Sequence, residues 1–215
     1  MTALDKGQVN IDADGVTLEG NLLVPGGATG IVLFAHGSGS SRFSSRNRFV
    51  AEALRDCRLG TLLIDLLTHD EELVDTRTAH LRFDIELLAK RLVGTAQWLG
   101  SEMPKTRVGL FGASTGGAAA LVAAARIPER IAAVVSRGGR PDLAGEALPH
   151  VKAPTLLIVG GDDGPVIAMN QTAFDQMTCP RDMKIIPGAS HLFEEPGALE
   201  QVAHLAGDWF GKYLV

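Results

Sequence analysis

The pentapeptide Gly112-Ala113-Ser114-Thr115-Gly116 has the residue types and spacing of a nucleophilic turn. It joins the apolar run 107–112 to the alanine-rich stretch 113–126, so a strand is expected before it and a helix after it. In that context the glycines of a Gly-x-Ser-x-Gly turn relieve contacts around a strained serine backbone, and the hydroxyl points into the cleft. We therefore expect Ser114 to be a catalytic nucleophile.

A serine hydroxyl is a weak nucleophile near neutral pH, so it needs a general base, and the base needs an orienting carboxylate. His191 lies in the stretch 188–197, between the last predicted strand and the last predicted helix, where a loop can reach over the strand ends. We predict that His191 is the base. Four other histidines stand at loop or helix positions and are expected to be solvated: His69, His80, His150 and His204.

The carboxylate is expected at the end of the strand that precedes His191, where Asp162 and Asp163 are adjacent. Pro165 suits the first position of a helix because its φ is fixed. Gly164 would then be the N-cap, and Asp163 would lie on the loop just before it, within reach of the histidine. Asp163 is the predicted triad acid, and Asp162 stays the alternative.

An oxyanion hole needs two backbone N–H donors. The residue after the nucleophile, Thr115, supplies one, and a loop after an early strand supplies the other. The segment His36-Gly37-Ser38-Gly39-Ser40-Ser41 follows the apolar run 30–36 and suits that role. We predict that the Ser38 amide is the second donor.

The elements that position these residues alternate along the chain. Strands are predicted at 7–11, 16–24, 30–36, 60–67, 107–112, 131–136, 153–161 and 183–187, and helices at 46–58, 82–101, 113–126, 166–177 and 197–214. The first two strands form an antiparallel hairpin with a turn at Asp14-Gly15, and the polar segment 68–80 is expected to be a loop. This alternation predicts an α/β fold, with a mostly parallel sheet covered by helices on both faces and its ligand beyond the carboxyl ends of the strands.

The motifs together resemble those of the α/β-hydrolases, and specifically the small dienelactone-hydrolase-like group. The resemblance covers nearly the whole chain, through the segments 36–37, 112–116, 159–166 and 188–197. It implies an α/β-hydrolase fold over a single domain, 1–215, and the common Gly-x-x-Asp of related hydrolases falls on Asp163. Dienelactone hydrolases proper carry a cysteine nucleophile where this chain has Ser114, so hydrolysis of carboxylic esters or lactones is the implied activity.

Composition excludes several other classes. The chain has 215 residues, 20 Lys plus Arg against 25 Asp plus Glu, and a net charge of −5, so it offers no basic field for nucleic acid. Cys57 and Cys179 are too few for a disulfide framework or a zinc cluster. The sequence shows no signal peptide and no apolar run of the ~18 residues that a membrane span needs. We expect a cytoplasmic monomer or small homo-oligomer that acts on a small-molecule ester, with no cofactor, no metal and no membrane or nucleic-acid partner.

Two features bear on the substrate. The strand at 131–136 is separated from the next by about 17 residues, too few for a helical cap domain, so no lid domain is expected and the site should be open. Five arginines stand near the predicted cleft, and a guanidinium there could bind a substrate carboxylate. These are Arg42, Arg46 and Arg48 in one loop and helix, and Arg137 and Arg140 in another loop.

The same residues bear on other possible functions. The segment 112–118 has part of a dehydrogenase glycine turn, but position 118 is Ala and the only tyrosine is Tyr213, so no Tyr-x-x-x-Lys is possible. No P-loop Gly-Lys-Ser/Thr occurs. Acyl transfer or perhydrolysis on the same triad stays open, because the acyl-enzyme is shared. A non-catalytic hydrolase-fold binding module also stays open.

Overall fold

The computed structural model describes residues 4–13 and 15–214 of the chain. Its strands are β1 (Leu4–Asp12), β2 (Thr17–Val24), β3 (Gly30–Ala35), β4 (Gly60–Ile64), β5 (Arg107–Ala113), β6 (Ile131–Arg137), β7 (Thr155–Gly160) and β8 (Arg181–Ile186). They form one sheet in the order β1-β2-β4-β3-β5-β6-β7-β8. β1 and β2 form the predicted antiparallel hairpin, and β2 also pairs antiparallel with β4, whereas the pairs from β4 to β8 are parallel. Asp14, of the predicted hairpin turn, lies outside the described residues.

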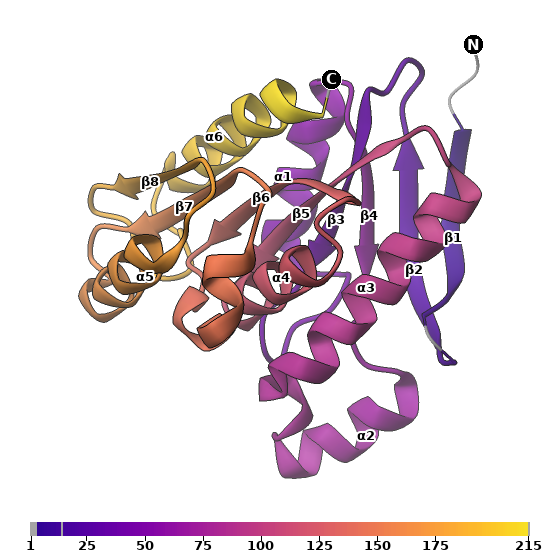
Figure 1. Ribbon diagram of the computed structural model, residues 1–215, viewed down its shortest axis with the longest axis horizontal. Coiled ribbons are helices and arrows are strands. Elements are labelled where there is room, and N and C mark those ends of the chain that lie inside the picture. Colours follow the sequence, from indigo (N-terminus) through magenta and orange to yellow (C-terminus); the bar gives the residue numbers. More distant parts are fainter. Residues whose placement is uncertain (1–3, 14, 215) are drawn as a thin grey trace.

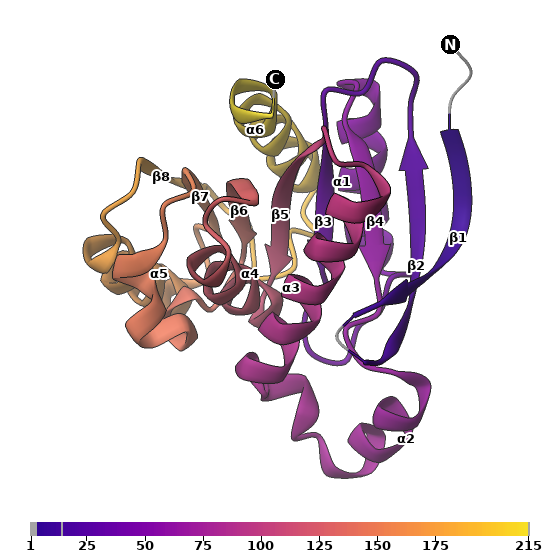
Figure 2. The same cartoon turned by 45° about the vertical axis from the view of Figure 1, so that its right-hand side comes forward.

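The sheet is covered on both faces because its central strands are apolar on both faces. In β3 every residue is buried, with Ile31 and Leu33 in one apolar cluster and Val32 and Phe34 in the other. Helices α1 (Ser45–Asp56) and α6 (Ala198–Tyr213) pack on the Val32 side. Helices α3 (Ile85–Glu102), α4 (Thr115–Arg126) and α5 (Gly164–Gln176) cover the other face, as Figures 1 and 2 show. This arrangement confirms the predicted α/β-hydrolase architecture.

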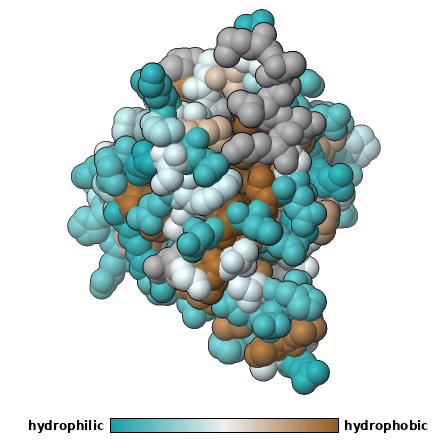
Figure 3. All heavy atoms as spheres, turned by 90° about the vertical axis from the view of Figure 1, so that its right-hand side faces the viewer, coloured by the Kyte–Doolittle hydropathy of each residue, from teal (hydrophilic) through white to brown (hydrophobic). Residues whose placement is uncertain are grey.

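The segment 68–80, predicted to be a loop, is instead largely helical. Helix α2 (His69–Thr78) begins with a capping box, in which the Thr68 hydroxyl accepts from the Glu71 N–H and the Glu71 carboxylate accepts from the Thr68 N–H. Among its described residues only Asp75 is buried, so α2 lacks the apolar stripe that periodicity detects. It projects from the body of the molecule (Figures 1 and 2), with Leu73 and Val74 about half exposed; Figure 3 shows apolar side chains at this lower end.

Two predicted helix starts are also corrected. The helix predicted at 82–101 is divided into a short 3-10 helix, η1 (Leu81–Phe83), and α3, because Asp84 caps α3 through a hydrogen bond from the Leu87 N–H. Helix α5 begins at Gly164 and has Asp163 as its N-cap, one residue earlier than predicted.

The connection after β6 contains a 3-10 segment, η2 (Pro141–His150), packed against α4 and α5. Within the described residues, no helix is long and apolar enough to cross a membrane.

Candidate active site

Ser114 occupies the sharp turn between β5 and α4, at the carboxyl edge of the sheet. Its φ of 50° and ψ of −122° lie in a region that non-glycine residues rarely adopt. The turn needs its flanking glycines. A Cβ on Gly112 would stand 2.4 Å from the Gly116 carbonyl oxygen, and a Cβ on Gly116 would stand 2.4 Å from the Ala35 carbonyl oxygen. The serine is therefore held in a strained backbone conformation for which the flanking glycines make room.

His191 and Asp163 meet across two loops at the same edge. The Nδ1 atom of His191, in the loop after β8, lies 2.6 Å from Oδ2 of Asp163, which follows β7. Although Asp163 is the N-cap of α5, its side chain makes no capping hydrogen bond, and its carboxylate contacts the imidazole instead. Asp162 contributes a backbone N–H to the Ala189 carbonyl, 3.0 Å away. The structure thus brings Asp163, and not Asp162, to His191.

Ser114 and His191 line one cavity of about 220 Å³. Ser38 lines it as well, together with Arg46 and Arg137. The side chain of His191 is 38% exposed, so water reaches the imidazole. The four exposed histidines of the sequence prediction, at positions 69, 80, 150 and 204, are indeed on the surface and do not line this cavity.

The glycine–serine loop after β3 lies directly against the nucleophile. A Cβ on Gly37 would come within 3.1 Å of the Ser114 Cβ, so the two backbones are in close contact. In the described part of the chain, neither the Ser38 N–H nor the Thr115 N–H takes part in the turn and loop hydrogen bonds. Thr115 is the first residue of α4, where N–H groups have no partner inside the helix. Both N–H groups therefore stay candidates for the two donors of an oxyanion hole.

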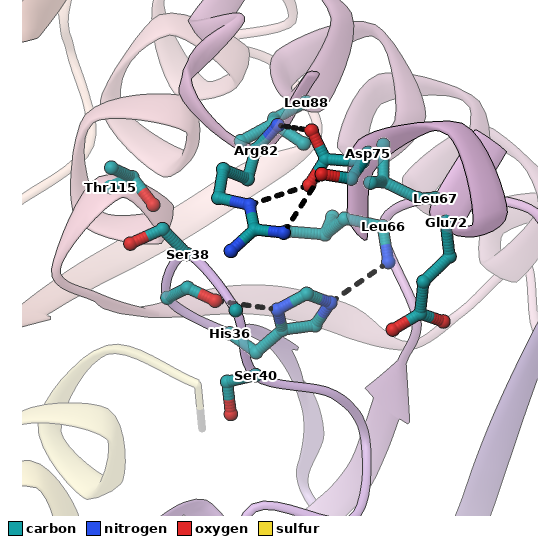
Figure 4. A pocket seen from close by; sticks show the side chains of 12 residues that line it. His36, Ser38, Ser40, Leu66, Leu67, Glu72, Asp75, Arg82, Leu88 and Thr115 are labelled. Carbon is teal, nitrogen blue, oxygen red and sulfur yellow. Dashed lines mark hydrogen bonds and ion pairs between the residues drawn. The ribbon is translucent and has the colours of Figure 1, made fainter. Parts of the chain in front are cut away.

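The half-buried imidazole of His36 fixes the beginning of this loop (Figure 4). Its Nε2 accepts a hydrogen bond from the Leu66 N–H at 3.1 Å, so the proton is on Nδ1, which donates to the Gly37 carbonyl at 2.9 Å. Burial lowers the pKa of His36, and it outweighs the nearby carboxylates of Asp65 and Glu72, which raise it. A neutral His36 therefore ties the loop to the strand end of β4.

A partly buried ion pair lies beside the same loop. Figure 4 shows Arg82 and Asp75 opposite His36 across a cavity of about 30 Å³, with the Arg82 guanidinium turned toward Asp75. Arg82 Nε donates to Asp75 Oδ2 at 2.6 Å, and Nη2 donates to the Asp75 carbonyl at 3.1 Å. Burial alone would raise the pKa of the Asp75 carboxyl, but the Arg82 hydrogen bonds and charge lower it. This pair holds α2 against η1, and no pattern in the sequence predicted it.

The arginines predicted near the cleft have different surroundings. Arg42 pairs with Asp65 and Glu19, and Arg140 donates two hydrogen bonds to Asp142. Arg137 is buried, lines the cavity beside Ser114 and His191, and makes no ion pair in the described part of the chain.

Both cysteines are free, and neither lines the cavity. The described residues contain no group of three or more histidine, cysteine and carboxylate side chains that could hold a metal ion.

Comparison with known proteins places the chain among hydrolases. Residues 71–210 match the model of the dienelactone hydrolase family. A crystal structure of a dienelactone hydrolase from Anabaena variabilis is 65% identical, with a TM-score of 0.95 over 97% of both chains. Est1E from Butyrivibrio proteoclasticus shares the fold, with a TM-score of 0.78 over 96% of this chain and 98% of its own at 16% identity.

A curated relative differs in length and in name. The Mycobacterium tuberculosis (strain H37Rv) protein named "Putative phosphoribosyl transferase Rv0571c" is 55% identical over 210 residues, which are 96% of this chain and 46% of that protein. This chain therefore spans about half the length of that relative.

Proposed function

Because this chain belongs to the dienelactone hydrolase family, we propose that it is a serine hydrolase of small carboxylic esters or lactones, acting through Ser114, His191 and Asp163. The observation that carries the proposal is the contact of 2.6 Å between His191 Nδ1 and Asp163 Oδ2, made at a cavity that Ser114 also lines. A nucleophile, a base and an orienting carboxylate are the three parts that ester hydrolysis without a cofactor needs.

In the acylation step, Ser114 Oγ attacks the ester carbonyl carbon while His191 Nε2 takes the hydroxyl proton. The carbonyl oxygen becomes an oxyanion, which the N–H groups of Ser38 and Thr115 stabilise; removal of one such donor typically costs about 10²–10³-fold in kcat. As the tetrahedral intermediate collapses, the bond to the alcohol oxygen breaks and His191 returns the proton to it. The alcohol leaves, and the acyl group remains on Ser114.

In the deacylation step, water takes the place of the alcohol. His191 Nε2 removes a proton from the water as its oxygen attacks the acyl carbon, and the same donors stabilise the second oxyanion. Collapse breaks the bond to Ser114 Oγ, which regains the proton from His191, and the carboxylic acid is released. Asp163 stays ionised throughout, keeps the Nδ1–H tautomer of His191 and stabilises the imidazolium that forms in each step.

Hydrolysis is favoured over acyl transfer by the exposure of the base. The His191 side chain is 38% exposed, so the acyl-enzyme stands in contact with solvent. A transferase or perhydrolase on the same triad has to keep water from its acyl-enzyme. The residues between β6 and β7 place no helical cap domain above the cavity.

The name of the Mycobacterium relative describes a protein about twice this length. This chain matches about half of that protein, and for this half the geometry supports ester hydrolysis.

The proposal is tested by steady-state kinetics with 4-nitrophenyl acetate and butyrate on the wild-type chain and Ser114→Ala. We expect the substitution to lower kcat by about 10³-fold or more and to leave the thermal unfolding cooperative. Ser101→Ala, at the exposed end of α3, is the matched control and should behave as wild type. Wild-type turnover in Ser114→Ala would overturn the proposal.

A further inference from the structure

One arginine connects helix α2 to the loop that carries Ser38. Arg82, in η1, uses two of its three guanidinium nitrogens on Asp75: Nε donates to the carboxylate at 2.6 Å, and Nη2 donates to the backbone carbonyl at 3.1 Å. The third nitrogen, Nη1, lies against the loop, since a Cβ on Gly39 would stand 3.2 Å from it. The guanidinium of Arg82 therefore lies between α2 and the residue that follows Ser38.

The segment 37–40, which we call the oxyanion loop, borders a cavity along its whole length. All four of its residues line the space of about 30 Å³ that Arg82 also lines. At its start, the Gly37 carbonyl accepts from His36 Nδ1 at 2.9 Å and from the Ser40 N–H at 3.2 Å. Its tip, Gly39, has a φ of 67°, and a glycine backbone is conformationally permissive. The guanidinium therefore limits the space into which the tip could relax.

Asp75 gives Arg82 a fixed anchor. Its side chain is 3% exposed, and it is the one buried residue of α2 within the described chain. The Asp75 carboxylate also accepts from the Arg82 backbone N–H at 3.1 Å, so the backbone of η1 and the guanidinium are held together. Charge-assisted hydrogen bonds of this kind are short and strong. Because Asp75 already supplies the counter-charge, the guanidinium keeps its position without an anionic ligand.

A second ion pair also holds α2 to the body of the molecule. Glu71 of α2 accepts from the buried Arg91 of α3 at 2.6 Å. Arg91 lines neither the cavity beside the oxyanion loop nor the cavity that contains Ser114. Two arginines therefore hold the same helix, and of the two it is Arg82 that lies against the oxyanion loop. Support of the helix and support of the loop can thus be separated by substitution.

We propose that Arg82, anchored by Asp75, is a positioning residue of the oxyanion hole, which keeps the oxyanion loop in the conformation that directs the Ser38 N–H at the oxyanion. The inference rests on the proposed function, in which Ser38 donates to that oxygen. Arg82 itself contacts no reacting atom. Its effect comes from geometry, since a displacement of about 1 Å caused by a change outside the reacting centre can lower the rate by roughly 10²-fold.

The test removes the guanidinium and measures the transition state separately from the substrate. In Arg82→Met we expect kcat for 4-nitrophenyl acetate to fall by about 10- to 100-fold and KM to stay within about threefold of wild type, because the oxyanion forms only after binding. Butylboronic acid gives the second readout: Ser114 Oγ bonds to boron, the hydroxyl proton passes to His191, and a boronate oxygen takes the oxyanion position. Its inhibition constant should rise by the factor by which kcat falls. Arg82→Lys, which keeps the charge but loses the planar fork, should recover part of both.

Arg91→Met is the matched control, because it removes the other arginine that holds α2. It should lower Tm but keep kcat and the inhibition constant within about threefold of wild type. Arg82→Met leaves the Asp75 carboxylate buried without its partner, so Arg82→Met/Asp75→Leu, which removes both charges, provides a second variant that should fold stably and keep the loss in kcat. Hydrogen exchange of the segment 37–40, followed by mass spectrometry, should be faster in both Arg82→Met variants and unchanged in Arg91→Met.

The outcomes distinguish this inference from the proposed function. Ser114-dependent hydrolysis at the wild-type rate in both Arg82→Met variants would overturn the role of Arg82 and leave the hydrolase standing. An equal loss of kcat in Arg91→Met would also overturn it, because Arg82 would then act only by holding α2. If the wild type hydrolyses no ester, the proposed function fails and hydrogen exchange decides. Faster exchange of 37–40 confined to the Arg82→Met variants supports the positioning role, and unchanged exchange overturns it.

Discussion

His191 Nδ1 and Asp163 Oδ2 lie 2.6 Å apart although 28 residues separate them in the chain. β7 and β8 are parallel neighbours, so the loops that follow them leave the sheet at the same edge. Asp163 could cap α5, yet its carboxylate faces the imidazole. The adjacent Asp162 has the same side chain and makes no such contact in the described residues, which provides an internal control for the orienting role.

Substituting Asn for each aspartate separates the two roles. Asp163→Asn keeps the shape but no longer favours the Nδ1–H tautomer of His191, so we expect kcat to fall by about 10²–10⁴-fold. Asp162→Asn should change kcat less than about threefold, since Asp162 contributes its backbone N–H to Ala189. Steady-state kinetics with 4-nitrophenyl acetate provides the measurement. The reverse ranking of the two variants would assign the orienting role to Asp162.

The length of the acyl chain is a second prediction. The cavity is about 220 Å³, and the connection between β6 and β7 is a 3-10 segment rather than a cap domain, so a long chain finds little apolar surface. Each methylene contributes ~0.8 kcal/mol only when it is fully buried. Acetyl to butyryl 4-nitrophenyl esters should therefore have a higher kcat/KM than decanoyl esters. A rise in kcat/KM toward decanoyl would show that another element, such as α2, covers the chain.

The stability of the chain should depend on the protonation of His36. Burial lowers the pKa of His36 below its ordinary value of 6.5 in the folded state, so between the two pKa values the unfolded chain binds more protons. The contribution of the neutral His36 side chain to the free energy of unfolding is therefore complete above about pH 6.5. It is lost as the pH falls toward the pKa of His36 in the folded state. Urea unfolding of wild type and His36→Gln at pH ~5 to ~7.5 measures this: the variant should be less stable at neutral pH and should depend less on pH.

His204→Gln is the control for that series, because His204 is an exposed residue of α6. It should follow the wild-type curve closely. The pH range stays above the titration of Asp75, whose pKa lies below its ordinary value of 3.8, so loss of the Arg82 pair does not contribute. An equal pH dependence in wild type and His36→Gln would show that His36 is not the titrating group.

The buried guanidinium of Arg137 has a cost in stability. Arg137 is buried and unpaired in the described structure, so replacing it with Met removes an uncompensated charge and keeps most of the volume. Arg137→Met should raise the free energy of unfolding by ~1 kcal/mol or more, which is about 2–4 °C in Tm for a chain of this length. Differential scanning calorimetry at neutral pH without added anions is the measurement. A lower Tm in the variant would show that Arg137 has a structural role.

Most of the fold and part of the site could be predicted from residue patterns. The run 30–36 is apolar at consecutive positions, as expected for a strand buried on both faces, and β3 is such a strand. Helix α2 was missed because it has no apolar stripe. The signal that could have revealed it is the pair Thr68 and Glu71, whose spacing is that of a capping box.

The partners of the arginines could not be predicted, since ion pairs join residues distant in sequence. Arg42 and its partner Asp65 are 23 residues apart, and the sequence does not distinguish this satisfied arginine from Arg137. The N-cap of α5 was misplaced by one residue for a local reason. Pro165 is accepted at either of the first two helical positions, and here it takes the second, after Gly164.

The central claim is that Ser114 becomes acylated, and the most direct measurement is the site of a covalent adduct. A fluorophosphonate reacts only with a serine whose neighbouring base has activated it, and the adduct is located by peptide mass spectrometry. We predict a single adduct on Ser114 in the wild type, none in Ser114→Ala, and much slower labelling in His191→Gln. An adduct on any other serine, or no adduct on Ser114 while ester hydrolysis proceeds, would contradict the account.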